Sequence, residues 1–153
     1  MAPSFDGPWD IYQPSELDPQ LEALAGKRAG LRRRLELLAQ DPCHPDVAAY
    51  RLSGPLAPVV CGVRLDRGFR MAFTTQPPLT ADDKPRVVVL YVGKRAPRHG
   101  PTDMWEVLHD LFDVENPAAG HHKPPCCQDS VPAIDPSALD RFLKALRRFN
   151  RGR

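Results

Sequence analysis

Two neighbouring segments, 59–65 and 69–75, place their apolar residues mainly on alternate positions. This is the period of a half-buried β-strand. The residues between them, 66–68, predict a hairpin turn, and we expect Gly68 to supply the positive φ that such a turn needs. One face of the hairpin would then be buried, and it would carry Cys61, Val63, Leu65, Phe69, Met71 and Phe73. The other, open face would carry Arg64 and Arg70.

In a third segment, 86–95, both the odd and the even positions are apolar from Val87 to Val92. This pattern is typical of a central strand that is covered on both faces. The segment ends in the sequence Gly93-Lys94-Arg95. Arginines on the open face of a hairpin, with cations at the end of the neighbouring strand, form a surface that suits phosphate.

Helical periodicity appears on both sides of these strands. Asp18 and Asp135 each precede a proline and are expected as N-caps, and Thr102 is expected to cap a third helix. The last helix carries a continuous apolar stripe that must be buried against the rest of the chain. We expect helices at about 18–26, 28–40, 103–112 and 136–149, a short strand at about 9–12, and an irregular link over 43–58.

With these elements in place, the chain resembles the RelE/ParE superfamily of bacterial type II toxins, small proteins that cut messenger RNA in the ribosome or poison gyrase. The likeness spans about residues 9–99 and is carried by the segments 9–12, 51–54, 63–65, 68–70 and 88–95. It implies an α+β fold in which an N-terminal strand and a helical hairpin pack on a small, mainly antiparallel, twisted β-sheet, with C-terminal helices added.

The resemblance also implies a division of the chain. We expect a flexible arm over 1–8, a RelE/ParE-like toxin domain over 9–112, a Pro-rich connector over 113–135 and an amphipathic C-terminal helix over 136–153. The connector and the last helix lie beyond the end of the family likeness.

The implied chemistry is RNA cleavage by attack of the RNA's own 2′-hydroxyl, which requires no metal and no cofactor. Arg70 and Arg95 match the catalytic arginines of the family. Arg64 matches a family lysine that assists the base side of the reaction, whereas a second family lysine is replaced by Gly62. His99 is the candidate acid or base near neutral pH. The expected RNA-binding residues are Lys94, Arg98, Arg32 and Arg33, although a solvated helix face is the favoured explanation for the last two.

Composition limits the class of protein but does not identify its function. A chain of 153 residues with 42% hydrophobic and 26% charged residues is ordinary for one globular domain, and a net charge of +2 does not by itself predict nucleic-acid binding. The 18 prolines predict turns and extended connections, particularly over 77–85 and 97–136. No apolar run is long enough for a membrane span and the start does not resemble a signal peptide, so we expect a cytoplasmic protein.

The cysteines are expected to be reduced, because the cytoplasm is a reducing compartment. Cys43, Cys61, Cys126 and Cys127 would then be thiols or metal ligands rather than disulfides. His121 and His122 lie close to the last two, so zinc is chemically possible. Adjacent Cys-Cys and His-His pairs seldom place both members on one ion, and we therefore predict no metal.

Three functions remain open from the sequence. The first is an mRNA-cleaving endoribonuclease toxin, whose partners would be a cognate antitoxin, mRNA and the ribosome. The second is a gyrase-poisoning toxin, which the missing lysine at Gly62 favours. The third is a non-catalytic binding protein on the same fold, which the long extension favours. The last helix could also occupy the antitoxin groove in cis.

Overall fold

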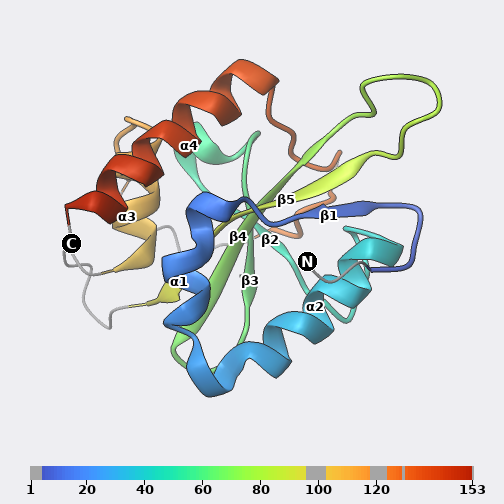
Figure 1. Ribbon diagram of the computed structural model, residues 1–153. Helices are drawn as coiled ribbons and strands as arrows, with labels where there is room; N and C mark the ends of the chain where they lie inside the picture. Colours follow the sequence, from blue (N-terminus) through green and yellow to red (C-terminus); the bar gives the residue numbers. More distant parts are fainter. Residues whose placement is uncertain (1–4, 96–102, 118–123, 129, 153) are drawn as a thin grey trace.

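The chain folds around a five-stranded open sheet in the order β1-β5-β4-β3-β2 (Figure 1). This computed structural model describes residues 5–95, 103–117, 124–128 and 130–152. β1 runs parallel to β5, and the other neighbouring strands are antiparallel. The strands are β1 (Asp10–Tyr12), β2 (Tyr50–Arg51), β3 (Cys61–Arg64), β4 (Phe69–Gln76) and β5 (Arg86–Lys94). The sheet is therefore mainly antiparallel, which confirms the expected α+β fold class.

Helices follow the first strand and end the chain. The α-helices are α1 (Asp18–Glu22), α2 (Arg28–Gln40), α3 (Met104–Leu111) and α4 (Pro136–Arg151), and the short 3-10 helices are η1 (Ser15–Leu17), η2 (Ala25–Lys27) and η3 (Gly54–Leu56). α1 and α3 contact β5, and α2 contacts β1. The central position of β5 explains its double-sided apolar pattern, because every residue from Val87 to Val92 is buried.

The β3–β4 hairpin has the predicted alternation but not the predicted turn. Val63 pairs with Met71, and Arg64 pairs with Arg70 on the alternate face. Gly68 does not adopt a positive φ, so that expectation is wrong. Its N–H donates to Oδ1 of Asp66 at 3.1 Å, and this side-chain bond closes the turn within ordinary backbone geometry.

Two of the expected helix starts need correction. Asp135 caps α4 as predicted, with its carboxylate accepting a backbone N–H from the first turn. α3 is capped by Asp103, whose Oδ2 accepts from the N–H of Trp105 at 3.1 Å, whereas the expected cap Thr102 lies outside the described residues. Asp18 is the first residue of α1 rather than its cap, because η1 already turns the chain there.

The C-terminal helix is packed against the body of the protein, alongside α3 and η1 (Figure 1). The ring of Phe142 stacks on that of Phe112 with 4.5 Å between the centroids. At the far end of α4, Arg147 pairs with Glu16 at 2.9 Å, and the side chains of Asn150 and Gln20 are hydrogen-bonded. The apolar stripe of α4 therefore packs against the rest of this chain.

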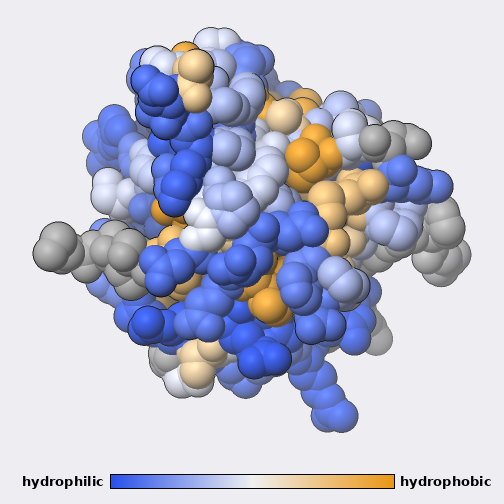
Figure 2. Space-filling view, turned by 90° about the vertical axis from the view of Figure 1, so that its right-hand side faces the viewer, coloured by the Kyte–Doolittle hydropathy of each residue, from blue (hydrophilic) through white to orange (hydrophobic). Residues whose placement is uncertain are grey.

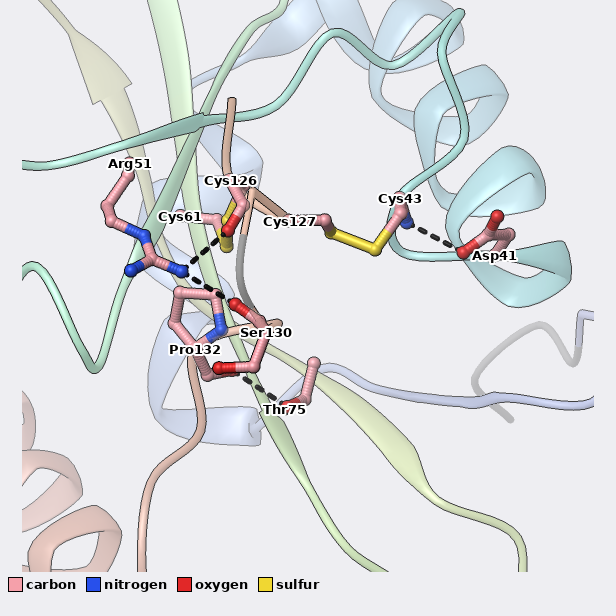
Figure 3. The surroundings of a disulfide bond; sticks show 9 residues. All are labelled: Asp41, Cys43, Arg51, Cys61, Thr75, Cys126, Cys127, Ser130 and Pro132. Carbon is pink, nitrogen blue, oxygen red and sulfur yellow. Dashed lines mark hydrogen bonds between the residues drawn. A yellow bond between two sulfur atoms is a disulfide. The ribbon is translucent and has the colours of Figure 1, made fainter. Parts of the chain in front are cut away.

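The four cysteines form two disulfides, Cys43–Cys127 and Cys61–Cys126 (Figure 3). The expectation that they are thiols or metal ligands is therefore wrong. The fold brings the paired Cα atoms to 5.7 and 5.8 Å, which is within the range that a disulfide bridges. His121 and His122 lie outside the described residues, and the described ones contain no group of three potential metal ligands.

The disulfide-bonded part of the connector completes one edge of the sheet. The N–H of Arg51 donates to the Pro124 carbonyl at 2.8 Å, and the N–H of Cys126 donates to the Ala49 carbonyl at 3.0 Å. The guanidinium of Arg51 also donates to the carbonyls of Cys126 and Ser130 (Figure 3). The two-residue strand β2 is thus held between β3 and the connector.

The described surface is mainly hydrophilic on the face shown in Figure 2, with small hydrophobic areas between hydrophilic ones. Leu79, in the β4–β5 loop, is a large hydrophobic side chain that stays 82% exposed. None of the helices in the described ranges has the length and apolarity that crossing a membrane requires.

We expect removal of either disulfide to destabilise the protein. Each bridge links residues far apart in sequence, 84 positions for Cys43–Cys127 and 65 for Cys61–Cys126. Loss of such a bridge typically costs about 2–5 kcal/mol of unfolding free energy. Double alanine variants of each pair, compared by urea denaturation, measure this cost. The Cys61–Cys126 pair should cost more, because it is fully buried and its removal leaves a cavity.

The control is the wild-type protein with both bridges reduced, which should be less stable than either double variant. Unchanged stability in both variants would contradict the role of the disulfides in holding the connector.

Candidate anion-binding site

Three arginines predicted from the sequence converge at one end of the sheet. Arg64 and Arg70 are direct cross-strand partners in β3 and β4. Arg95 follows β5, and its N–H donates to the carbonyl of Gly68 at 2.7 Å, which ties it to the hairpin turn. Burial lowers the pKa of Arg70, and the positive charges of Arg64 and Arg95 lower it further. The three guanidinium groups therefore lie within electrostatic reach of one another.

Burial distinguishes Arg70 from its two neighbours. Arg64 and Arg95 are exposed, whereas Arg70 is only 4% exposed. Its Nη1 donates to the carbonyls of Asp66 at 2.8 Å and Phe69 at 3.0 Å. The expectation that Arg70 lies on an open face is therefore wrong, since its side chain also braces the hairpin turn.

Tyr50 is the residue of this site that the sequence did not reveal. It lies in β2, within the segment expected to be an irregular link, and it pairs with Gly62 of β3. A Cβ atom placed on Gly62 would be 2.5 Å from Cε2 and 2.9 Å from the hydroxyl oxygen of Tyr50. The phenol ring thus lies across Gly62. Trp105 of α3 packs edge-on against the same ring, with 6.1 Å between the centroids.

This arrangement accounts for a glycine at position 62. A side chain there would clash with the Tyr50 ring, so the ring would have to move. Strand pairing puts Tyr50 and Gly62 on the same face of the sheet as Arg64 and Arg70.

Burial is the largest influence on the pKa of Tyr50. Burial raises the pKa of Tyr50 to about 12, while the charges of Arg70, Arg95 and Arg64 and hydrogen bonding from Arg70 act in the opposite direction. Desolvation outweighs the cations, so the phenol keeps its proton at neutral pH. Beside three permanent positive charges, the site therefore holds a neutral hydroxyl.

No carboxylate balances the arginines among the residues that the structure describes. The ion pairs found there are Lys27–Asp66, Arg32–Glu36, Lys144–Asp140 and Arg147–Glu16, and none of them includes Arg64, Arg70 or Arg95. Asp66 lies in the turn beside Arg70, but its carboxylate pairs with Lys27. Like charges placed directly opposite each other on two strands are destabilising, and a buried charge requires compensation. The cluster of Arg64, Arg70 and Arg95 is thus complementary to an anion.

The other predicted site residues are distributed differently. Lys94 is exposed at the end of β5, beside Arg95. Arg98 and His99 lie outside the described residues. Arg32 and Arg33 are exposed on α2, where Arg32 pairs with Glu36 at 3.3 Å, and no contact described here joins them to the arginine cluster.

His109, in α3, is a buried histidine. Its Nδ1 lies 2.7 Å from the carbonyl oxygen of Trp105, one turn earlier in α3. α3 is packed between β5 and α4, so few of its residues remain exposed.

The comparisons with known proteins found no similar protein: no family model, no curated protein and no solved structure matches this chain. The RelE/ParE resemblance thus rests on the residues quoted above.

We expect Gly62→Ala to destabilise the protein through its contact with Tyr50. The added methyl would meet the ring at 2.5 Å, and overpacking of this kind costs about 1–3 kcal/mol. The double variant Gly62→Ala/Tyr50→Ala removes the ring and should show strong positive coupling in a thermodynamic cycle. Gly68→Ala is the matched control, because nothing lies within 4 Å of a Cβ there. Equal effects of the two glycine substitutions would contradict the placement of Tyr50.

We also expect Tyr50 to ionise at unusually high pH. The ultraviolet phenolate signal lost in Tyr50→Phe should titrate at about 12 rather than at the usual 10.0. Because the unfolded chain releases this proton first, the Tyr50 contribution to stability is constant below pH 10 and falls as the pH rises to 12. A difference signal centred on the usual value would mean that the phenol is solvated.

Proposed function

We propose that this chain is a RelE-like endoribonuclease, the toxin of a type II toxin–antitoxin system, which cleaves mRNA presented by the ribosome without a metal ion. The observation that carries this proposal is the convergence of Arg64, Arg70 and Arg95, none of which forms an ion pair among the described residues. A phosphodiester is the anion that such a site would meet in RNA.

The three arginines would act on the charge that develops at phosphorus. When the 2′-oxygen attacks, the P–O2′ bond forms, the P–O5′ bond breaks, and negative charge gathers on the phosphate oxygens. Arg70 is held in a fixed orientation by two carbonyls, which makes it a preorganised donor. Arg64 and Arg95, both exposed, are available to the incoming backbone.

Proton transfer completes the proposed reaction. The 2′-hydroxyl loses a proton to a base, with assistance from Arg64, and the 5′-oxygen receives one from an acid. His99 is the group proposed to act as the acid or base in these proton transfers. The products are a 2′,3′-cyclic phosphate and a free 5′-hydroxyl.

Gyrase poisoning is the alternative function, and the placement of Tyr50 weakens the sequence argument for it. Gly62 lacks the family lysine, but the Tyr50 hydroxyl brings another hydrogen-bonding group to the same place. Gyrase poisoning would appear as DNA damage on induction rather than as cleaved messages.

The proposal also includes a cognate antitoxin and a cytoplasmic location. A short antitoxin segment that covers the arginine face would neutralise the toxin. Disulfides are uncommon in the reducing cytosol, so the two bridges count against a cytoplasmic location. Trapping thiols in cells before lysis would show whether the four cysteines are oxidised there.

We expect Arg95→Ala to lower RNA cleavage by about ten- to a thousandfold, the scale of losing one preorganised charged donor. Arg70→Lys keeps the charge but loses the planar fork, and it should be similarly impaired. Arg70→Ala is less informative, because it also removes the bonds that brace the turn. Mapping of RNA 5′ ends after induction, with folding checked by thermal melting, provides the measurement.

Arg141→Ala is the matched control, since Arg141 is exposed on α4 and should leave cleavage unchanged. Intact cleavage and growth inhibition in both Arg95→Ala and Arg70→Lys would refute the nuclease proposal.

A further inference from the structure

The two disulfides differ in their exposure to solvent. Cys43 is exposed and Cys127 is half-buried, whereas Cys61 and Cys126 are 0% and 1% exposed. A pocket of about 350 Å³ lies beside the first bridge and is lined by residues 42–45, 48–50 and 125–127. A thiol in solution therefore reaches the Cys43–Cys127 bond in the folded protein, while the body of the protein shields the Cys61–Cys126 bond.

The exposed bridge also holds segment 43–49, which joins α2 to β2. The described hydrogen bonds of this segment before Ala49 are local, with partners no more than three residues away. The Cys43–Cys127 bond ties the start of the segment to the connector (Figure 3), and the bond from the Cys126 N–H to the Ala49 carbonyl ties its end. Segment 43–49 and the connector thus form a ring, which the disulfide closes.

This ring holds a strained residue, Ala48. Its φ is 53°, in the left-handed region that a residue with a Cβ atom seldom adopts. Such a conformation persists only where the surrounding structure fixes it. Ala48 lies between the buried side chain of Val47 and the hydrogen-bonded Ala49, within the ring that the disulfide closes. Loss of the covalent bond removes one of these constraints, so that Ala48 can return to a negative φ.

We propose that Cys43–Cys127 is a redox site, which a dithiol reductant opens while Cys61–Cys126 stays closed, and that its opening releases segment 43–49 from the strained conformation. Exposed disulfides are in general the labile or regulatory ones, whereas buried structural ones resist reduction. Disulfides of cytosolic proteins are usually of the transient, redox-sensing kind. The inference goes beyond the proposed function, because it does not depend on RNA cleavage.

The reaction is thiol–disulfide exchange. A thiolate of the reductant forms a bond to Sγ of Cys43, the more exposed sulfur, and the Cys43–Cys127 bond breaks. Its electron pair leaves on Sγ of Cys127, which takes a proton from water. The second thiol of the reductant loses its proton to water and attacks its own sulfur in the mixed disulfide. Cys43 leaves as a thiolate and is protonated, so two electrons and two protons pass from the dithiol to the two cysteines.

The test places the oxidised full-length protein, without denaturant, in mixtures of reduced and oxidised dithiothreitol. After acid quenching, free thiols are alkylated and each cysteine is scored by tandem mass spectrometry of its peptide. Cys43 and Cys127 should become alkylated together. They should require a ratio of reduced to oxidised dithiothreitol that is at least about tenfold lower than Cys61 and Cys126 require.

The control repeats this titration in urea that unfolds the chain. The two bridges span similar sequence separations, 84 and 65 residues, so all four cysteines should then be reduced at nearly the same ratio. A difference that persists in urea would overturn the inference, because it would not arise from burial in the fold. Native protein in which all four cysteines react together, or in which Cys61 and Cys126 react first, would also overturn it.

Ala48→Gly tests the release of segment 43–49. Glycine adopts a positive φ without the Cβ penalty, so it stabilises the closed ring relative to the open one. Opening of the bridge should then require a ratio of reduced to oxidised dithiothreitol about fivefold higher than in the wild type.

Asp113→Gly is the matched control for this variant. Asp113 also has a positive φ, 56°, but it follows α3 and its N–H donates to the Asp110 carbonyl, outside the ring. Its replacement should leave the reduction of Cys43–Cys127 unchanged. Equal shifts in both glycine variants, or no shift in Ala48→Gly, would show that segment 43–49 keeps its conformation after reduction and would overturn the proposed release.

Discussion

The buried guanidinium of Arg70 sets the constraint on which the rest of the site depends. A cation that is 4% exposed must be compensated, and the hydrogen bonds described for Arg70 go to two backbone carbonyls rather than to a carboxylate. These partners orient the charge without cancelling it. With Arg64 opposite and Arg95 beside the turn, the fold maintains a positive potential that an anion would relieve.

The connector supports this arrangement from the edge of the sheet. β2 is only two residues long, and an edge strand of that length is weak by itself. The connector bonds to both sides of Tyr50, and the disulfides Cys43–Cys127 and Cys61–Cys126 hold it in place. Oxidation of the cysteines is thus linked physically to the position of the phenol over Gly62.

The sequence predicted what local periodicity encodes and missed what distant segments impose. Alternation and helical stripes sufficed for β3, β4, β5, α2 and α4. β2 is too short to carry such a pattern, since it has only two residues between β3 and the connector. Its contacts with the connector reach 75 residues further along the chain, as in the bond from the Arg51 guanidinium to the Cys126 carbonyl. The burial of Arg70 and the pairing of the cysteines likewise depend on segments that only the folded chain brings together. Arg64 and Arg95 were predictable since they follow directly from strand alternation and a strand end.

The most direct test of the central claim follows the arginine side chains themselves. In the oxidised protein, Nε–H resonances of Arg64, Arg70 and Arg95 can be monitored by nitrogen-15 NMR while inorganic phosphate is added. An anion site at this cluster predicts saturable shifts of these three signals with one common affinity, which weakens as salt is raised. Shifts that do not saturate, or that are equally large for the exposed Arg141, would contradict it.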